Sequence, residues 1–186
     1  NNIAIDDDNF IWLTANSQDA YDRMNAVYTG DSAISSIKRL NPKGDDVLMR
    51  NSVNEWAPGG DVVENPQNAS SIVSVAIKSN GLYTLVDQAR NKLFTYDANG
   101  NLLYAFGGTG SQLGVFQLIV DAVYDGDDLL VLDKSTNSIT RFTPTAYAIT
   151  IEDALDADKK QEFQRSVECW REVNKKNANF DQAYVG

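Results

Sequence analysis

The stretch Val75-Ala-Ile-Lys-Ser-Asn-Gly-Leu-Tyr-Thr-Leu-Val-Asp87 recurs 46 residues later as Asp121-Ala-Val-Tyr-Asp-Gly-Asp-Asp-Leu-Leu-Val-Leu-Asp133. Each copy runs from an apolar segment, through a turn rich in Gly, Asn and Asp, into a second apolar segment that ends in Asp. Such a pattern predicts two short antiparallel strands joined by a tight turn. The same offset pairs Asn91 with Asn137, so we expect one register without a gap to cover both copies.

A third copy of the repeat lies upstream, in two parts. Residues Ile3–Leu13 match Val75–Leu85 at an offset of 72, and Ile37–Gly44 match Leu93–Gly100 at an offset of 56. The two offsets differ by 16 residues, which places an insertion within residues 15–36. The first copy is therefore expected to be the least regular of the three.

Each repeat is long enough for four strands. In the middle copy, Leu93–Tyr96 alternates as a pleated strand does, and Asp97–Gly100 supplies residues that tolerate a turn. Leu102–Phe106 predicts a further strand, which Gly107–Gly110 ends. Four strands in about 46 residues is typical of β-propeller blades, whose repeats are roughly 40 to 50 residues long.

The middle copy also resembles an NHL-type propeller repeat. The similarity rests on Asn91-Lys-Leu-Phe-Thr-Tyr-Asp97 and on the connector Phe106-Gly-Gly-Thr-Gly110, followed by Gly114-Val-Phe116. It covers residues 1–147, although the third copy lacks the usual glycine spacing around Gly126. The resemblance implies a mainly β fold of about three four-stranded blades, with six blades in the complete propeller. The expected repeats lie at residues 1–50, 72–110 and 119–147.

After Pro144 the apolar residues recur with the period of a helix. Thr150 with Asp153 fits a capping box, and two helices broken near residues 158–161 are expected. Residues 148–186 resemble a tetratricopeptide repeat, with matching positions at Ala154, Phe163, Ser166, Trp170 and Val173. A single repeat of this kind cannot bury its own apolar face, so we expect it to dock on the propeller segment or on another chain.

The combination of the two segments is similar to a bacterial family of unknown activity in which an NHL propeller and tetratricopeptide-like helices precede a Yip1-type membrane domain. The resemblance implies an extracytoplasmic, cell-surface or membrane-associated parent protein. The chain begins with Asn1-Asn-Ile-Ala-Ile5, inside an expected strand, which suggests an excised fragment. Three blades are half of six, and the open half would expose strand edges and apolar faces. We therefore expect a protein partner, for example a second copy that pairs with these faces.

Composition excludes several mechanisms. The chain of 186 residues has no histidine, so Ser/His/Asp triads, Cys/His pairs and histidine-based zinc sites are ruled out. Its formal net charge of −10 argues against nucleic acid and against anionic membrane surfaces as partners. No apolar run approaches the roughly 18 residues that a membrane helix needs, so no direct membrane contact is expected. Cys169 is the single cysteine, which rules out an intrachain disulfide.

The carboxylates and the thiol predict structural roles. Asp87 and Asp133 end equivalent strands, where aspartates hold turns through backbone hydrogen bonds. Residues 6–9 and 125–128 are acidic but lack the spacing and the distal Glu of a calcium loop. Cys169 has no histidine to activate it. We therefore expect no catalytic residue, no metal site and no cofactor.

Aromatic residues in irregular segments are the remaining candidates for a binding site. Tyr21 and Tyr28 lie in the insertion, and Trp56 lies in the long connection between the first two repeats. Together with Arg50, they could form a platform that holds a sugar or an extended peptide. The alternative is that these side chains cap the hydrophobic ends of the blades.

Three classes of function remain open at this point. The sequence favours a non-catalytic binding or assembly module of a larger protein. A carbohydrate-binding surface domain is the second class, indicated by the loop aromatics. The third is a metal-dependent propeller hydrolase or lyase, of the lactonase or amidating-lyase kind, whose site would lie mostly in blades outside this sequence.

Overall fold

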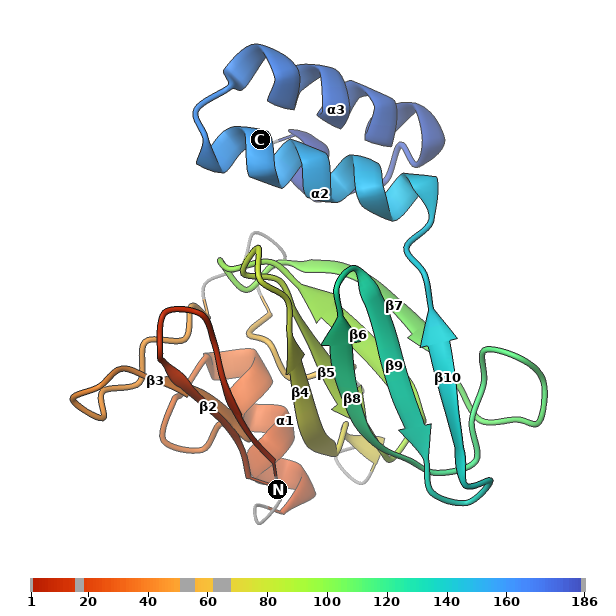
Figure 1. Cartoon of the computed structure of the whole chain (residues 1–186). Helices are drawn as coiled ribbons and strands as arrows, with labels where there is room; N and C mark the ends of the chain where they lie inside the picture. The colour runs from red at the N-terminus through yellow and green to blue at the C-terminus, as the bar shows by residue number, and fades with distance from the viewer. Residues whose placement is uncertain (1, 16–18, 51–55, 62–67, 185–186) are drawn as a thin grey trace. The chain divides into compact units, whose positions relative to one another are not determined.

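Short apolar strands fold into three antiparallel sheets in the computed structural model, which describes residues 2–15, 19–50, 56–61 and 68–184 (Figure 1). The first sheet contains β1 (Ile3–Ile5), β2 (Ile11–Thr14) and β3 (Ile37–Leu40). The middle sheet contains β4 (Ile72–Ile77), β5 (Tyr83–Asp87), β6 (Lys92–Tyr96) and β7 (Leu102–Gly107). The third sheet contains β8 (Ile119–Asp125), β9 (Asp128–Asp133) and β10 (Ser138–Phe142).

These antiparallel sheets of three or four strands, followed by C-terminal helices, resemble propeller blades. Four strands were expected in each, yet among the described residues only the middle sheet has four. In the first sheet a single bridge from Leu40 to Asp46 stands where the fourth strand was expected. After the third sheet, the chain enters a helix at Ala146 instead. The fourth strand is therefore the part of the repeat that the neighbouring sequence most easily replaces.

The register between the middle and third sheets corrects the expected gap-free offset. Val75 pairs with Leu85, whereas Ala122 pairs with Val131, so β9 follows β5 by 46 residues but β8 follows β4 by 47. The cause is the hairpin turn, which has three residues between Lys78 and Leu82 in the middle sheet and two residues, 126 and 127, in the third. The shorter turn moves every residue of β8 by one position.

The turn chemistry of the repeat is confirmed. Asn91 and Asn137 have positive φ angles of 54° and 52°, the left-handed conformation that Asn tolerates in turns. Asp87 accepts hydrogen bonds from the backbone N–H groups of Ser71 and Ala89 at 2.9 and 3.0 Å. Asp133 accepts four such bonds at 2.7–3.2 Å. Both aspartates therefore hold turns, as their positions predict.

The insertion in the first repeat contains a helix, α1 (Ala20–Thr29). Asp19 caps its N-terminus by accepting a hydrogen bond from the backbone N–H of Asp22. Gly30 ends the helix with a φ of 66°, a conformation that favours glycine. The helix explains why this segment breaks the strand pattern.

The sheets stack in chain order with alternate residues of each strand on opposite faces. We call the face of a sheet that points toward the preceding sheet its leading face, and the face that points toward the following sheet its trailing face. On the leading face of the middle sheet, Val75, Leu85 and Phe94 are at most 2% exposed and share one core with Trp12 and Ile37 of the first sheet. The first interface is therefore trailing face on leading face.

The second interface has the same polarity. Val86 and Leu93, on the trailing face of the middle sheet, form a second core with Ala122, Leu129 and Val131 of the third sheet. The first strands of the sheets, β1, β4 and β8, are neighbours in sequence order. Sheets that stack face to face with their first strands adjacent are typical of propeller blades.

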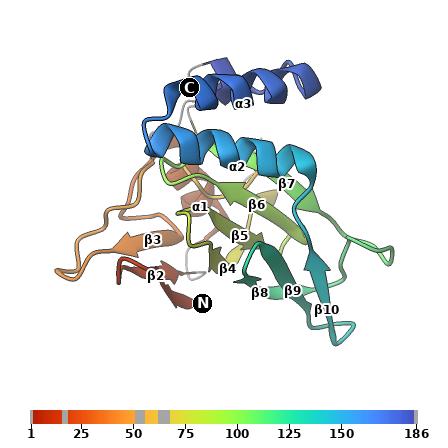
Figure 2. The same cartoon turned by 45° about the horizontal axis from the view of Figure 1, so that its top comes forward.

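The chain divides into two compact units, Asn1–Phe142 and Thr143–Gly186. The second unit contains α2 (Ala146–Lys159), α3 (Phe163–Lys176) and a short 3-10 helix, η2 (Asp181–Tyr184). Figure 2 shows α2 and α3 side by side. The helical segment thus begins earlier than the expected boundary at residues 147 and 148, which lie inside α2.

The break between α2 and α3 at residues 160–162 confirms the two predicted helices. The predicted capping box at Thr150 is wrong. Thr145 caps α2 and accepts a hydrogen bond from the backbone N–H of Ala148, whereas the hydroxyl of Thr150 donates to the carbonyl of Ala146 inside the helix. The reason is that Pro144, which cannot follow a helical residue easily, places the start of the helix directly after it.

The helical unit has a small aromatic core. The ring of Trp170 stacks on Phe180 with centroids 6.1 Å apart, and Tyr147 meets Phe180 edge to face at 6.5 Å. The indole N–H of Trp170 donates to Asp158 at 3.1 Å. Within the described residues, no helix has both the length and the apolar character that a membrane crossing requires.

Candidate functional site

Tyr28 and Trp56, two of the four candidate binding residues, lie together. Their ring centroids are 4.8 Å apart and the rings are nearly perpendicular, at 75°. The two residues are 41% and 42% exposed. Ala57, next to Trp56, donates its backbone N–H to the carbonyl of Val27 at 3.0 Å, which fixes this segment to the end of α1. The structure thus builds an exposed aromatic pair from two distant parts of the sequence.

The other two candidates are placed differently. Tyr21 lies on α1 two helical turns before Tyr28, about 10 Å along the axis, so it flanks the aromatic pair. Arg50 forms an ion pair with Asp46 at 2.7 Å and donates to the carbonyls of Leu48 and Ile37 at 3.1 and 3.0 Å. The Arg50 side chain is 9% exposed. Its guanidinium therefore fastens the segment after β3 to the first sheet.

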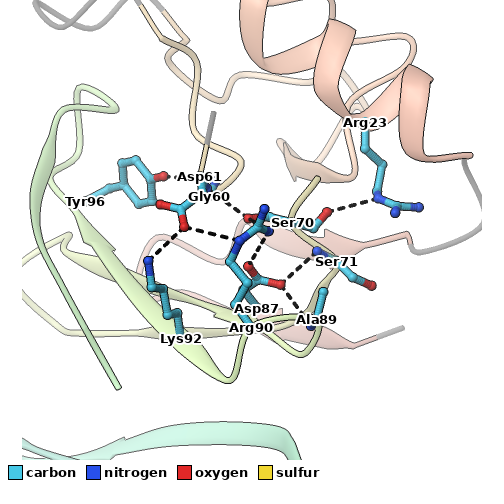
Figure 3. Close-up of polar contacts among 10 residues, drawn as sticks. All are labelled: Arg23, Gly60, Asp61, Ser70, Ser71, Asp87, Ala89, Arg90, Lys92 and Tyr96. Atoms are coloured by element: carbon cyan, nitrogen blue, oxygen red, sulfur yellow. Dashed lines mark hydrogen bonds and ion pairs between the residues drawn. The ribbon is translucent and has the colours of Figure 1, made fainter. Parts of the chain in front are cut away.

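A polar network that the sequence pattern did not predict ties the middle sheet to the connection before it (Figure 3). The carboxylate of Asp61 accepts a hydrogen bond from Lys92 at 2.8 Å and lies 3.4 Å from the guanidinium of Arg90. Arg90 also lies 3.5 Å from Asp87, whose side chain is fully buried. We call these four residues the Asp61 network. Its two acids and two bases pair with one another.

Ser70 and Arg23 extend the Asp61 network. The hydroxyl of Ser70 accepts hydrogen bonds from the backbone N–H of Asp61 at 2.8 Å and from Arg90 at 3.4 Å. Arg23, on α1, donates to the carbonyl of Ser70 at 3.0 Å (Figure 3). The network therefore connects the inserted helix, the irregular connection and the middle sheet.

Tyr96 completes the attachment of the connection. Its hydroxyl oxygen accepts hydrogen bonds from the backbone N–H groups of Gly59 and Gly60 at 3.4 and 3.2 Å. Burial raises the pKa of Tyr96 to about 12, so the hydroxyl stays protonated at neutral pH. A protonated hydroxyl in this position holds the loop and does not act as a base. The network has the chemistry of a structural clamp.

The leading face of the first sheet is an apolar surface with no sheet against it in the described structure. Ile3, Ile5 and Ile11 are 71%, 66% and 40% exposed. Leu13 pairs with Ile3 across the strands, which puts it on this face, and Lys38 pairs with Leu13 in turn. The leading face is therefore aliphatic and carries one lysine.

The trailing face of the third sheet is a second apolar surface. Val123, Leu132 and Ile139 are 58%, 38% and 67% exposed. Leu130 belongs to the same face because it pairs with Val123. At one end of the face, the guanidinium of one arginine contacts two carboxylates at 2.7 and 3.2 Å, and these three residues are Arg141, Asp128 and Asp125. The charged group carries one net negative charge.

The described residues offer little for catalysis. Among them, no group of three or more acidic or Cys side chains could hold a metal ion. Burial raises the pKa of Cys169, with Asp153 adding to the effect, which lowers the thiolate fraction at neutral pH. A groove of about 470 Å³ on the helical unit contains this thiol and is lined by Thr150, Glu168, Cys169, Arg171, Glu172 and Lys175. The groove has the ordinary character of a charged helix surface.

Comparisons with known proteins add a likeness in fold. No family model and no curated protein matches the chain. Among solved structures, the chain is similar to selenomethionine-substituted virginiamycin B lyase from Staphylococcus aureus, with 11% sequence identity and a TM-score of 0.40. The match covers 76% of this chain and 40% of the lyase chain, so this chain spans less than half of that protein. A likeness of this strength to a β-propeller carries no argument about a site or an activity.

Proposed function

We propose that this chain is a non-catalytic assembly module of a larger, membrane-tethered extracytoplasmic protein, which joins other β-sheets through its two outer faces. The observation that carries the proposal is the pair of apolar surfaces at the two ends of the sheet stack, with Ile3 and Ile139 71% and 67% exposed. Burying an aliphatic side chain of this size stabilises an assembly by about 1.5–3 kcal/mol. Contiguous apolar patches on a soluble domain mark interaction surfaces.

In this proposal the three sheets are blades of an NHL-type propeller with six blades when complete. The conserved geometry of the repeat supports this reading, since equivalent turns at Asn91 and Asn137 share the left-handed conformation. Residues 148–186 would be a tetratricopeptide-like segment that contacts protein. The exposure of Phe163 and Val167, one turn apart on α3 at 65% and 38%, supports a contact surface there.

Site-specific photo-crosslinking tests the assembly function. A photoreactive amino acid would replace Ile5 on the leading face of the first sheet or Val123 on the trailing face of the third, in the full chain within its native host. Leu113, 96% exposed but outside every sheet, is the matched control. We expect crosslinks to protein at both face positions and little at Leu113. Equal yields at all three positions, or no adduct at either face, would overturn the proposal.

The exposed pair Tyr28 and Trp56 favours carbohydrate or extended-peptide binding as a second candidate function. Perpendicular aromatic rings that are each about 40% exposed offer apolar faces against which a sugar ring can stack. A glycan array probed with the protein, with Trp56→Ala and with the control Phe163→Ala tests this. We expect a bound glycan to be lost in the first variant and kept in the second. Retention of all signals by Trp56→Ala would exclude the pair as the site.

A further inference from the structure

The stack of sheets has a direction. Both interfaces between sheets join the trailing face of one sheet to the leading face of the next. The two uncovered faces are therefore not of the same kind: the first sheet leaves a leading face free, and the third sheet leaves a trailing face free. A trailing face fits a leading face in both interfaces that the structure contains, so each end of the chain carries the kind of surface that the other end accepts.

Equivalent positions show which residues would meet. At the first interface Trp12 lies 4.7 Å from Tyr83, ring centroid to ring centroid. At the second, the hydroxyls of Thr84 and Tyr124 are 2.7 Å apart. Trp12 and Thr84 occupy the same place on successive trailing faces, since β2 pairs with β1 in the same register as β5 with β4.

The same place on the free trailing face belongs to Leu130, which lies 46 residues after Thr84. On the free leading face, Ile11 is equivalent to Tyr83, and Ile5 is equivalent to Tyr124. An interface of the same geometry would therefore place Leu130 against Ile5 and Ile11. The contact is aliphatic on both sides and leaves no polar group without a partner.

The charges of the two free faces are also complementary. The leading face carries Lys38, which pairs across the strands with Leu13. The trailing face carries Arg141 between Asp125 and Asp128, with one net negative charge. Opposite charges at the rims of two apolar surfaces favour this pairing over the pairing of either face with its own kind.

We propose that a second copy of this chain docks head to tail, with the leading face of each first sheet on the trailing face of the other copy's third sheet. A twofold axis makes both contacts identical and closes six sheets into one ring, which lies within the roughly four to eight blades that propellers use. This inference rests on the proposed assembly function and names the partner. The chain itself supplies both faces that the closure needs.

Sedimentation velocity over a range of protein concentrations, with face variants, tests the head-to-tail dimer. The protein should sediment as a species of about 41 kDa, twice the 20.5 kDa of one chain. Ile5→Asp on the leading face and Ile139→Asp on the trailing face should each give a monomer, because either change damages both contacts of the ring. The control Leu113→Asp should remain a dimer. Circular dichroism and a thermal melt confirm that each variant is folded.

Mixing the two face variants gives the decisive measurement. Ile5→Asp retains an intact trailing face and Ile139→Asp retains an intact leading face, so the mixture forms one undamaged contact. We expect a heterodimer that dissociates at least tenfold more readily than the original dimer and that neither variant forms alone. Pairing of like faces predicts instead that one variant stays dimeric and that mixing restores nothing, which would overturn the proposal.

A monomer at every concentration would also overturn it. The photo-crosslinking result then separates this outcome from failure of the proposed function. Adducts between Ile5 or Val123 and a different protein would leave the assembly function intact with another partner. Absence of adducts at both faces would remove the assembly function as well.

Discussion

The middle sheet and the two sheets beside it come from the same repeat, yet their surroundings differ. The middle sheet is covered on both faces, and its strand β5 is buried along its whole length. The flanking sheets are each covered on one face, so their strands alternate between buried and exposed residues. Leu93 and Ile139 occupy equivalent positions and are 0% and 67% exposed. Neighbouring sheets, rather than the repeat itself, therefore decide whether an apolar side chain stabilises the chain or remains available to a partner.

The largest expected effect comes from truncating these two equivalent residues. Leu93→Ala should lower the free energy of unfolding by about 3 kcal/mol, because it leaves a cavity between two packed sheets. Ile139→Ala should cost less than about 1 kcal/mol in the isolated chain. Urea denaturation measures both. If a second copy covers the trailing face, the cost at Ile139 should rise with protein concentration; equal costs at the two positions would contradict the difference in burial.

Two equivalent turns give the next largest contrast. Gly44 and Gly100 have φ angles of 88° and 86°, and each closes its turn with a hydrogen bond to the residue three positions earlier. A Cβ at Gly44 would meet nothing within 4 Å, whereas at Gly100 it would lie 2.6 Å from the carbonyl of Met49. Gly44→Ala should cost about 1 kcal/mol from backbone strain, and Gly100→Ala about 2–3 kcal/mol because a clash adds to it.

Thermal melts of the two glycine variants provide the measurement. A similar loss for both would mean that the loop around Met49 moves aside. In that case the middle sheet would be no more constrained at this turn than the first sheet is.

A smaller effect is expected at the turn aspartate of the third sheet. Asp133 is 2% exposed and accepts four backbone hydrogen bonds. Asp133→Ala should cost about 2 kcal/mol, since hydrogen bonds to a charged group are worth about 1.5–3 kcal/mol and some donors will find water. The exposed Asp7→Ala serves as the control and should change stability by less than about 0.5 kcal/mol. A neutral result at Asp133 would show that the turn holds without its carboxylate.

The smallest effect is a pH dependence that the flanking sheets contribute. Burial alone would raise the pKa values of Asp6 and Asp133, but hydrogen bonds outweigh it and hold both below the ordinary value of 3.8. For Asp6 these bonds come from Trp12, Phe10 and Arg39. A depressed pKa in the folded state means that the stabilisation is present above about pH 4 and is lost as the pH falls below it.

Denaturation midpoints measured between neutral pH and about pH 2.5 check this sign. Asp133→Asn should flatten part of the decline, because the amide does not titrate. An identical acid profile in the variant and the original protein would assign the decline to other carboxylates.

Several features of the fold could be predicted from the sequence for a clear physical reason. The recurrence of apolar residues at period two, with Asn, Asp and Gly at fixed positions, determines strands and turns locally. The turns at Asn91 and Asn137 and the aspartates that hold them were found in this way. The break between α2 and α3 was found from the change of period.

The candidate site was only partly accessible to the same reasoning. Exposed aromatic residues outside the periodic segments indicated Tyr28 and Trp56, which the structure brings together. Arg50 was indistinguishable from a ligand-binding residue because its partner, Asp46, is fixed only when the segment after β3 folds back. The Asp61 network had no signal, since its members come from irregular segments and from a turn.

The sequence by itself determined the repeat, its turns and the change to helices, because backbone conformation depends on neighbouring residues. The tertiary structure decided the one-residue shift of β8, the loss of the fourth strand from the flanking sheets and the partners of the charged side chains. It also decided that the chain ends in two different apolar faces. Those features depend on how separate segments pack in space, and a pattern along one strand does not specify its neighbour across a sheet interface.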